Sequence, residues 1–174
     1  MRTYQFLALS YIELGRNEEA IAAYDKAAAF NLNDKIDYFN QAILYGKEGL
    51  YEKAIAFYDK AIEIDDEFAE AYNGRGNSKS DLGLYEEAIR DYDRAVEIDH
   101  TNSKAYNNRA LSYHGLGLYE EALADYDKAI SLNPEIGRYW RNRSKAKRAL
   151  GDKEGAIRDC DHAKSLYKGL INCF

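Results

Sequence analysis

The chain has 174 residues and a net charge of −6, with one proline, two cysteines and sixteen tyrosines. A negative net charge argues against a general nucleic-acid binder, because phosphate contacts need a basic surface. No run approaches the roughly 20 apolar residues that span a bilayer, and the first residues lack the features of a signal peptide. Cys160 and Cys173 have no metal-site or disulfide-framework spacing and suit a reducing compartment. We therefore expect a cytoplasmic protein without membrane or nucleic-acid partners.

A short motif recurs every 34 residues. It reads RNEEAI at 16–21, LYEKAI at 50–55, LYEEAI at 84–89, LYEEAL at 118–123 and DKEGAI at 152–157. Self-similarity at a fixed period of this length indicates an array of equal structural repeats. The chain divides without insertion into repeats 1–34, 35–68, 69–102, 103–136 and 137–170, which form an array over 1–170, followed by a tail at 171–174.

Each repeat is predicted to form two helices joined at a glycine. Repeat position 15 is glycine in all five repeats, and glycine ends a helix because it adopts a left-handed conformation at little cost. Glutamate at repeat position 18 falls in the first turn of the second helix, where its charge complements the helix dipole. Alanines at positions 20 and 27 let the helices approach closely, since larger residues would push them apart.

An aspartate occupies repeat position 25 throughout, beside a tyrosine in the first four repeats. The column consists of Asp25, Asp59, Asp93, Asp127 and Asp161. We interpret it as a solvated face, because a buried carboxylate in every repeat would cost too much free energy.

An aromatic residue stands near the start of each repeat, and a small residue follows four positions later. The aromatic column is Tyr4, Tyr38, Tyr72, Tyr106 and Trp140. With the alanine columns and the 34-residue period, this pattern resembles the tetratricopeptide repeat family. The resemblance implies an all-α fold, an α-solenoid of five helix–turn–helix repeats forming a right-handed superhelix. First helices would line a concave groove, and each repeat would contact mainly its neighbours.

Amides are frequent on the helix positions that would face this groove, which are repeat positions 2, 5, 6, 9, 12 and 13. They are Asn40, Asn73, Asn77, Asn107, Asn108 and Asn142. Because an amide both donates and accepts hydrogen bonds, we predict that these residues hold the backbone of an extended peptide. The alternative is that they are ordinary solvated residues, although asparagine is a mediocre helix former.

The groove is expected to grade from apolar at its first repeats to basic at its last. Phe6, Leu9, Phe39 and Ile43 would take apolar side chains of the peptide. Six cations without an acid lie within eleven residues of the fifth repeat: Arg138, Arg141, Arg143, Lys145, Lys147 and Arg148. Such a local positive field attracts carboxylates, so we predict that Arg138, Arg141 and Lys145 hold acidic groups. A merely solvated basic helix is the alternative.

Repeats three to five also resemble, in part, family members that clamp the C-terminal carboxylate of a partner. Asn77, Asn108 and Arg138 fall on three of the five clamp places. Asn73 and Asn142 stand where the clamp pattern has lysine and arginine. The partial match implies an acidic or C-terminal carboxylate segment as ligand, with a less specific acidic-peptide site as the alternative.

The function predicted from these patterns is that of a scaffold or adaptor, not an enzyme, that binds a protein or peptide partner. His100, His114 and His162 are scattered without metal-ligand spacing, and no phosphate loop or catalytic triad occurs. No cofactor or metal is therefore expected. Two alternatives stay open. The array could self-associate as a homo-oligomer through uncapped ends, or it could be the regulatory part of a larger protein.

Overall fold

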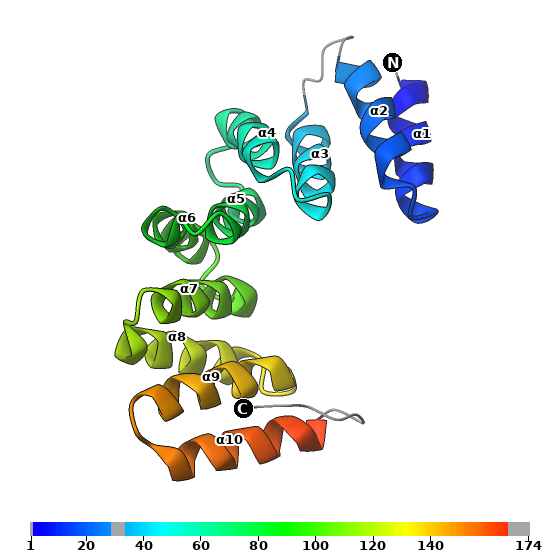
Figure 1. Cartoon of the computed structure of the whole chain (residues 1–174). Coiled ribbons are helices and arrows are strands. Elements are labelled where there is room, and N and C mark those ends of the chain that lie inside the picture. The colour runs from blue at the N-terminus through cyan, green and yellow to red at the C-terminus, as the bar shows by residue number, and fades with distance from the viewer. Residues whose placement is uncertain (1, 29–33, 167–174) are drawn as a thin grey trace. The chain divides into compact units, whose positions relative to one another are not determined.

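A computed structural model describes residues 2–28 and 34–166 of the chain (Figure 1). Within these residues there are ten α-helices and no β-strand. The predicted tail at 171–174 lies outside the described residues. The chain divides into two compact bodies, an N-terminal body of residues 1–83 and a C-terminal body of residues 84–174, and each is described by itself.

Both bodies are built from helices that pair in chain order. The N-terminal body contains α1 (Arg2–Glu13), α2 (Asn17–Ala28), α3 (Lys35–Lys47), α4 (Tyr51–Ile64) and α5 (Ala69–Asp81). The C-terminal body contains α6 (Tyr85–Ile98), α7 (Ser103–Gly115), α8 (Tyr119–Leu132), α9 (Gly137–Ala149) and α10 (Lys153–Leu166). The odd-numbered helices are the first helices of the repeats and the even-numbered ones the second helices, which confirms the predicted helix–turn–helix repeats.

The glycine at repeat position 15 ends the first helix of each repeat, as predicted. All five of these glycines have a positive φ, between 70° and 88°. At Gly117 the chain then turns back, and the N–H of Leu118 donates to the carbonyl of Tyr113 at 2.9 Å. A side chain at this φ would be strained, and glycine avoids the strain. The second helices follow at once, each with the position-18 glutamate in its first turn.

Small residues hold the paired helices close together. The alanines at repeat position 20 are at most 1% exposed in all five repeats. Larger side chains fill the space around them: Tyr45, Tyr58 and Phe68 in the N-terminal body, and Tyr126 and Tyr139 in the C-terminal body. The alanines at position 20 thus have the predicted packing role.

The aspartate column at position 25 corrects the sequence interpretation of a merely solvated face. Its carboxylates keep one exposed side, but each of the first four is bonded to the residue at position 7 of the following repeat. Arg75 donates to Asp59 at 2.6 Å, Arg109 to Asp93 at 2.7 Å and Arg143 to Asp127 at 2.6 Å. Gln41 donates to Asp25 at 2.9 Å in the same way. The column therefore joins consecutive repeats.

A second set of carboxylates, at repeat position 23, is buried. Asp125 accepts two hydrogen bonds from Arg109, each of 2.7 Å. Asp159 accepts two of 2.7 Å from Arg143, and Lys147 lies 2.9 Å from it. Burial alone would raise the pKa of Asp159, but these hydrogen bonds outweigh it and hold the pKa below its usual value. One arginine thus pairs with an aspartate of its own repeat and with one of the repeat before.

Within the described residues, no helix is long and apolar enough to cross a membrane. Cys160 is buried at the repeat position that tyrosine occupies in the other four repeats.

Candidate peptide-binding face

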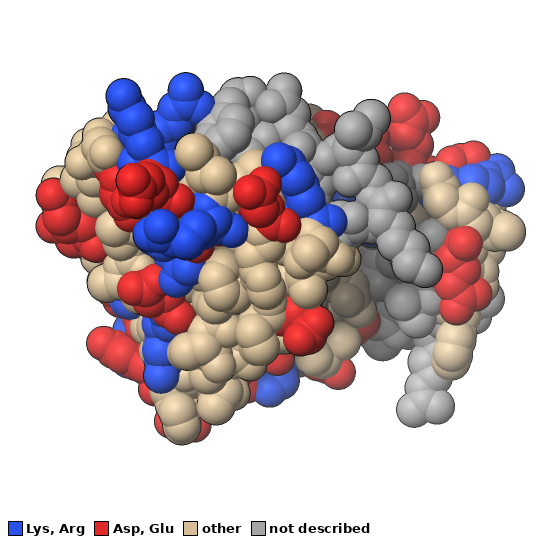
Figure 2. Space-filling view, turned by 90° about the horizontal axis from the view of Figure 1, so that it is seen from below, with Lys and Arg blue, Asp and Glu red and all other residues tan. Residues whose placement is uncertain are grey.

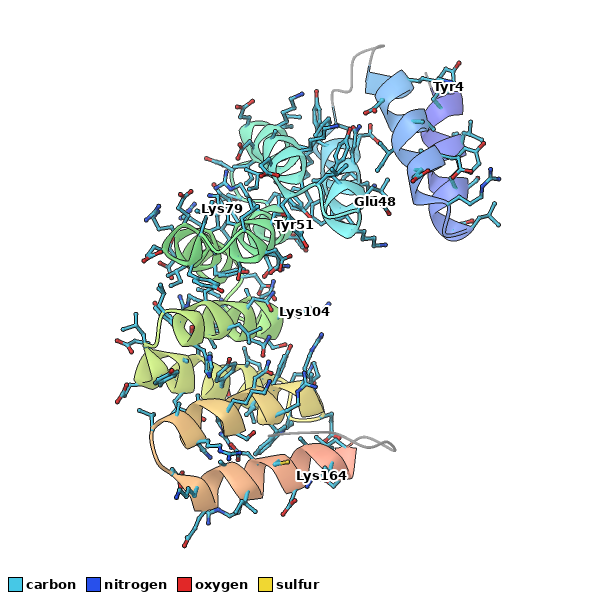
Figure 3. The ribbon with its side chains drawn as sticks, in the orientation of Figure 1. Tyr4, Glu48, Tyr51, Lys79, Lys104 and Lys164 are labelled. Atoms are coloured by element: carbon cyan, nitrogen blue, oxygen red, sulfur yellow. The ribbon has the colours of Figure 1, made fainter. Side chains whose placement is uncertain are left out.

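The first helices of repeats four and five form one side of the C-terminal body. α7 and α9 lie against each other, and Figure 3 shows their side chains, with Lys104 labelled near the start of α7. We call the residues at repeat positions 2, 5, 6, 9 and 12 of these two helices the α7–α9 face. They are Lys104, Asn107, Asn108, Leu111, His114, Arg138, Arg141, Asn142, Lys145 and Arg148.

The cations of α7 and α9 divide into two classes. Arg109, Arg143 and Lys147 lie off the face and are bound to the aspartates described above. In the described part of the chain, no hydrogen bond or ion pair to a carboxylate is found for four of the five lysines and arginines of the face: Lys104, Arg138, Arg141 and Lys145. Neither helix contains an Asp or Glu. The predicted basic cluster is therefore partly structural. We call the cations without a carboxylate partner open cations, and they include Arg138, Arg141 and Lys145, which were predicted from the sequence to bind acidic groups.

The α7–α9 face differs in this respect from the surface at the end of the chain. Viewed from the side of α10, lysine and arginine side chains are interspersed with aspartate and glutamate side chains (Figure 2). α10 itself carries both signs, for example Glu154 near Arg158 and Asp161 near Lys164. Positive charge without an acid in the same helices is thus a local property of α7 and α9.

Arg141 is only half exposed, and its Nε is buried. Among the described residues, no acceptor pairs with that N–H. Burying a polar N–H without a partner is unfavourable. The Nε–H of Arg141 is therefore a buried donor on this face without a partner among the described residues.

The amides of the face are bonded to one another. Asn142 Nδ2 donates to Asn107 Oδ1 at 3.0 Å, and Asn107 Nδ2 donates to Asn108 Oδ1 at 3.1 Å. Asn107 and Asn142 are only 4% and 7% exposed, whereas Asn108 is half-buried. This chain of amides ties α9 to α7, a role that the sequence reading of a peptide-binding ladder did not include.

His114 also belongs to the face, although it was not among the residues selected from the sequence. It is half-buried and its ring meets Tyr119 edge-on at 5.1 Å between centroids. Burial lowers the pKa of His114, and the charge of Lys145 lowers it further. The sequence did contain a signal for His114, because it stands at repeat position 12, one of the positions predicted to face the groove.

The remaining predicted residues lie in the N-terminal body. Phe39 is half-buried, with its ring 4.9 Å from Phe68 and 5.8 Å from Tyr58, and Ile43 packs against the same core cluster. Both therefore contribute to the core as well as to the surface. Asn40 and Asn73 are half-buried, whereas Asn77 and Phe6 are exposed. The side chain of Leu9 lies outside what the structure describes.

This architecture, in which pairs of helices repeat along the chain, is that of the helical-repeat proteins. Family models described as "Tetratricopeptide repeat" match residues 2–34, 37–68 and 103–136, and one described as "TPR repeat" matches residues 76–117. The chain belongs to the tetratricopeptide repeat family.

Several solved structures are similar to this chain. A crystal structure of MamA is 24% identical, with a TM-score of 0.83 over 91% of this chain and 93% of that chain. MamA 41-end from Desulfovibrio magneticus RS-1 is 21% identical, with a TM-score of 0.87 over 95% and 93%. YrrB, described as a TPR protein with an unusual peptide-binding site, is 21% identical, with a TM-score of 0.75 over 94% and 84%. These likenesses show the fold. No curated protein sequence matches the chain.

Proposed function

We propose that the chain is a non-catalytic scaffold or adaptor that binds an extended segment of a partner protein through the exposed sides of its first helices. Membership of the tetratricopeptide repeat family supports this proposal, as does the likeness to YrrB with its peptide-binding site. Fold alone does not determine function, so the choice of ligand rests on the residues of the site.

One observation carries the proposal. Some cations of α7 and α9 are bound to aspartates, whereas Arg138, Arg141 and Lys145 have no carboxylate partner among the described residues. Arg138, Arg141 and Lys145 bind acidic groups of the partner, either side-chain carboxylates or a C-terminal carboxylate, because charge-assisted hydrogen bonds are the strong ones. Leu111 is exposed beside them and contacts an apolar side chain. Asn108 bonds to the peptide backbone, and Asn107 and Asn142 hold its amide in place.

The residues predicted for binding in the N-terminal body are less charged. Asn40, Asn73 and Asn77 bond to the peptide backbone in this proposal. Phe6, Leu9, Phe39 and Ile43 contact apolar side chains, Phe39 and Ile43 through the part of their surface that the core leaves exposed.

Binding of a fluorescein-labelled peptide rich in Asp and Glu, followed by anisotropy, tests the basic part of the proposal. The double variant Arg138→Glu/Arg141→Glu should weaken binding by at least about tenfold, because two attractive contacts become repulsive. The control Arg90→Glu/Arg158→Glu changes the net charge equally at exposed positions of α6 and α10 and should bind like the wild type. Equal affinity of all three proteins would refute the proposal for this face.

A second candidate function is self-association through α1. Phe6 on this helix and Leu14, directly after its end, are 66% and 68% exposed, and exposed apolar side chains favour a protein contact. Sedimentation velocity at two concentrations tests this candidate. A concentration-dependent dimer that Phe6→Ser/Leu14→Ser abolishes would support it, and a monomer at the higher concentration would exclude it.

A further inference from the structure

Three of the open cations form a line along α9. Arg138, Arg141 and Lys145 follow one another at spacings of three and four residues, which places them on one side of a helix. The line covers about 10 Å of the helix axis at a rise of about 1.5 Å per residue. Arg141 lies in the middle, so that the long side chains on either side of it can reach the same bound group.

The Nε–H of Arg141 is a hydrogen-bond donor that a bound group could pair with. Its Nε is buried, and within the part of the chain that the structure describes it has no acceptor. A guanidinium presents Nε–H and one Nη–H as a planar fork that fits two oxygens of an oxyanion. An anion bound at this fork would remove the unfavourable state of the N–H.

The surroundings of Arg141 favour an anion with more than one charge. Lys104 and Lys145 are exposed, and α7 and α9 contain no carboxylate. A single carboxylate that filled the fork would neutralise one cation and leave Arg138 and Lys145 uncompensated. A phosphoryl group carries about −1.5 to −2 charges near pH 7 and three acceptor oxygens.

We propose that the line Arg138–Arg141–Lys145 binds a phosphorylated serine or threonine side chain of the partner segment. The fork of Arg141 bonds two phosphoryl oxygens, and Arg138 and Lys145 approach the third oxygen from the two sides. This inference rests on the proposed function and adds the chemical class of the bound group.

The N–H of Arg141 Nε can be observed directly by ¹⁵N–¹H NMR, with its signal assigned by its loss in Arg141→Lys. The probes are three peptides, Gly-Gly-X-Gly-Gly, in which X is phosphoserine, glutamate or serine, and inorganic phosphate, all at equal ionic strength. The phosphoserine peptide should shift the Arg141 Nε–H signal and bind at least about fivefold more tightly than the glutamate peptide, because it offers more charge and more oxygens. Inorganic phosphate should shift the same signal, and the serine peptide should not.

Two comparisons make the result specific. The Nε–H signal of the exposed Arg158 on α10 should stay in place with every probe. Arg141→Lys keeps the charge but loses the fork, and should lower the affinity for the phosphoserine peptide by at least about fivefold. If the glutamate and phosphoserine peptides bind equally well, the inference is overturned while the acidic-peptide function stands. If no probe shifts the signal and the acidic peptide also fails to bind, both are overturned.

Discussion

Arginine at repeat position 7 is the residue that connects the repeats most directly. In the C-terminal body, Arg109 and Arg143 each bond a buried aspartate of their own repeat and a more exposed aspartate of the preceding repeat. A buried carboxylate is tolerated only when it is paired and hydrogen-bonded. The same arginine–aspartate bonds recur because the same contact between helices recurs in each repeat. Position 7 therefore has a structural role, unlike the positions of the open cations.

Removal of one such arginine should therefore be costly. Arg109→Ala leaves Asp125 buried without its two hydrogen bonds, and we expect the free energy of unfolding to fall by about 2–4 kcal/mol. Arg158→Ala, at an exposed i,i+4 pair, should change it by no more than about 0.5 kcal/mol. Urea unfolding followed by circular dichroism measures both. Equal effects of the two variants would show that the paired arginines do not stabilise the fold.

Acid should weaken the fold through the same carboxylates. Because the pKa of Asp159 lies below its usual value in the fold, the unfolded state binds protons more readily. The contribution of Asp159 to stability is present above the unfolded pKa of about 3.9 and is lost as the pH falls through the lower folded pKa. The stability difference between wild type and Asp159→Asn should therefore be largest near pH 7 and shrink below about pH 4. A difference that stays constant from pH 7 to pH 3 would contradict this assignment.

At the scale of the helix, each first helix has one side that packs and another that is open, and glycine adjusts the packing. In α5, Gly74 stands at repeat position 6, where α3, α7 and α9 have asparagine. A Cβ at Gly74 would lie 2.5 Å from Cζ of the buried Tyr58 ring. The break in the asparagine column thus has a packing cause, because the tyrosine ring occupies the space of the side chain.

Two helical glycines should consequently respond to alanine in opposite directions. Gly74→Ala is expected to destabilise the fold by about 1–3 kcal/mol through overpacking against Tyr58, despite the better helix propensity of alanine. Gly46→Ala meets no atom closer than 4.0 Å and should stabilise α3 by up to about 1 kcal/mol. Thermal unfolding of the two variants measures both changes. Stabilisation by both would mean that the contact with Tyr58 relaxes freely.

The helices and their ends could be predicted from the sequence because they depend on local features within one repeat. Glycine at position 15, glutamate at 18 and alanine at 20 act within their own helix pair. The bond from Arg109 to Asp93 joins two repeats, and the mutual bonding of Asn107 and Asn142 depends on how α7 meets α9. A comparison of equivalent positions does not reveal such contacts. A signal was nevertheless present, since Gln41, Arg75, Arg109 and Arg143 form a donor column at position 7.

At the scale of the whole molecule, the net charge is −6, although the α7–α9 face is locally positive. Repetition imposes the same packing residues on every repeat, so differences between repeats are free to serve recognition. In the C-terminal body these differences place cations without internal partners on α7 and α9, while the cations needed for packing are paired. The central claim is that this face, rather than the second helices, contacts the partner.

Photo-crosslinking in the source cell tests this claim most directly. Benzoylphenylalanine is placed at Leu111 on the α7–α9 face or, as a control of similar exposure, at Ile64 on the second helix α4; these residues are 43% and 48% exposed. We predict a covalent adduct with a partner protein from position 111 and none from position 64, with loss of the adduct when Arg138→Glu and Arg141→Glu are added. Equal adducts from both positions, or an adduct that survives the charge reversal, would contradict the claim.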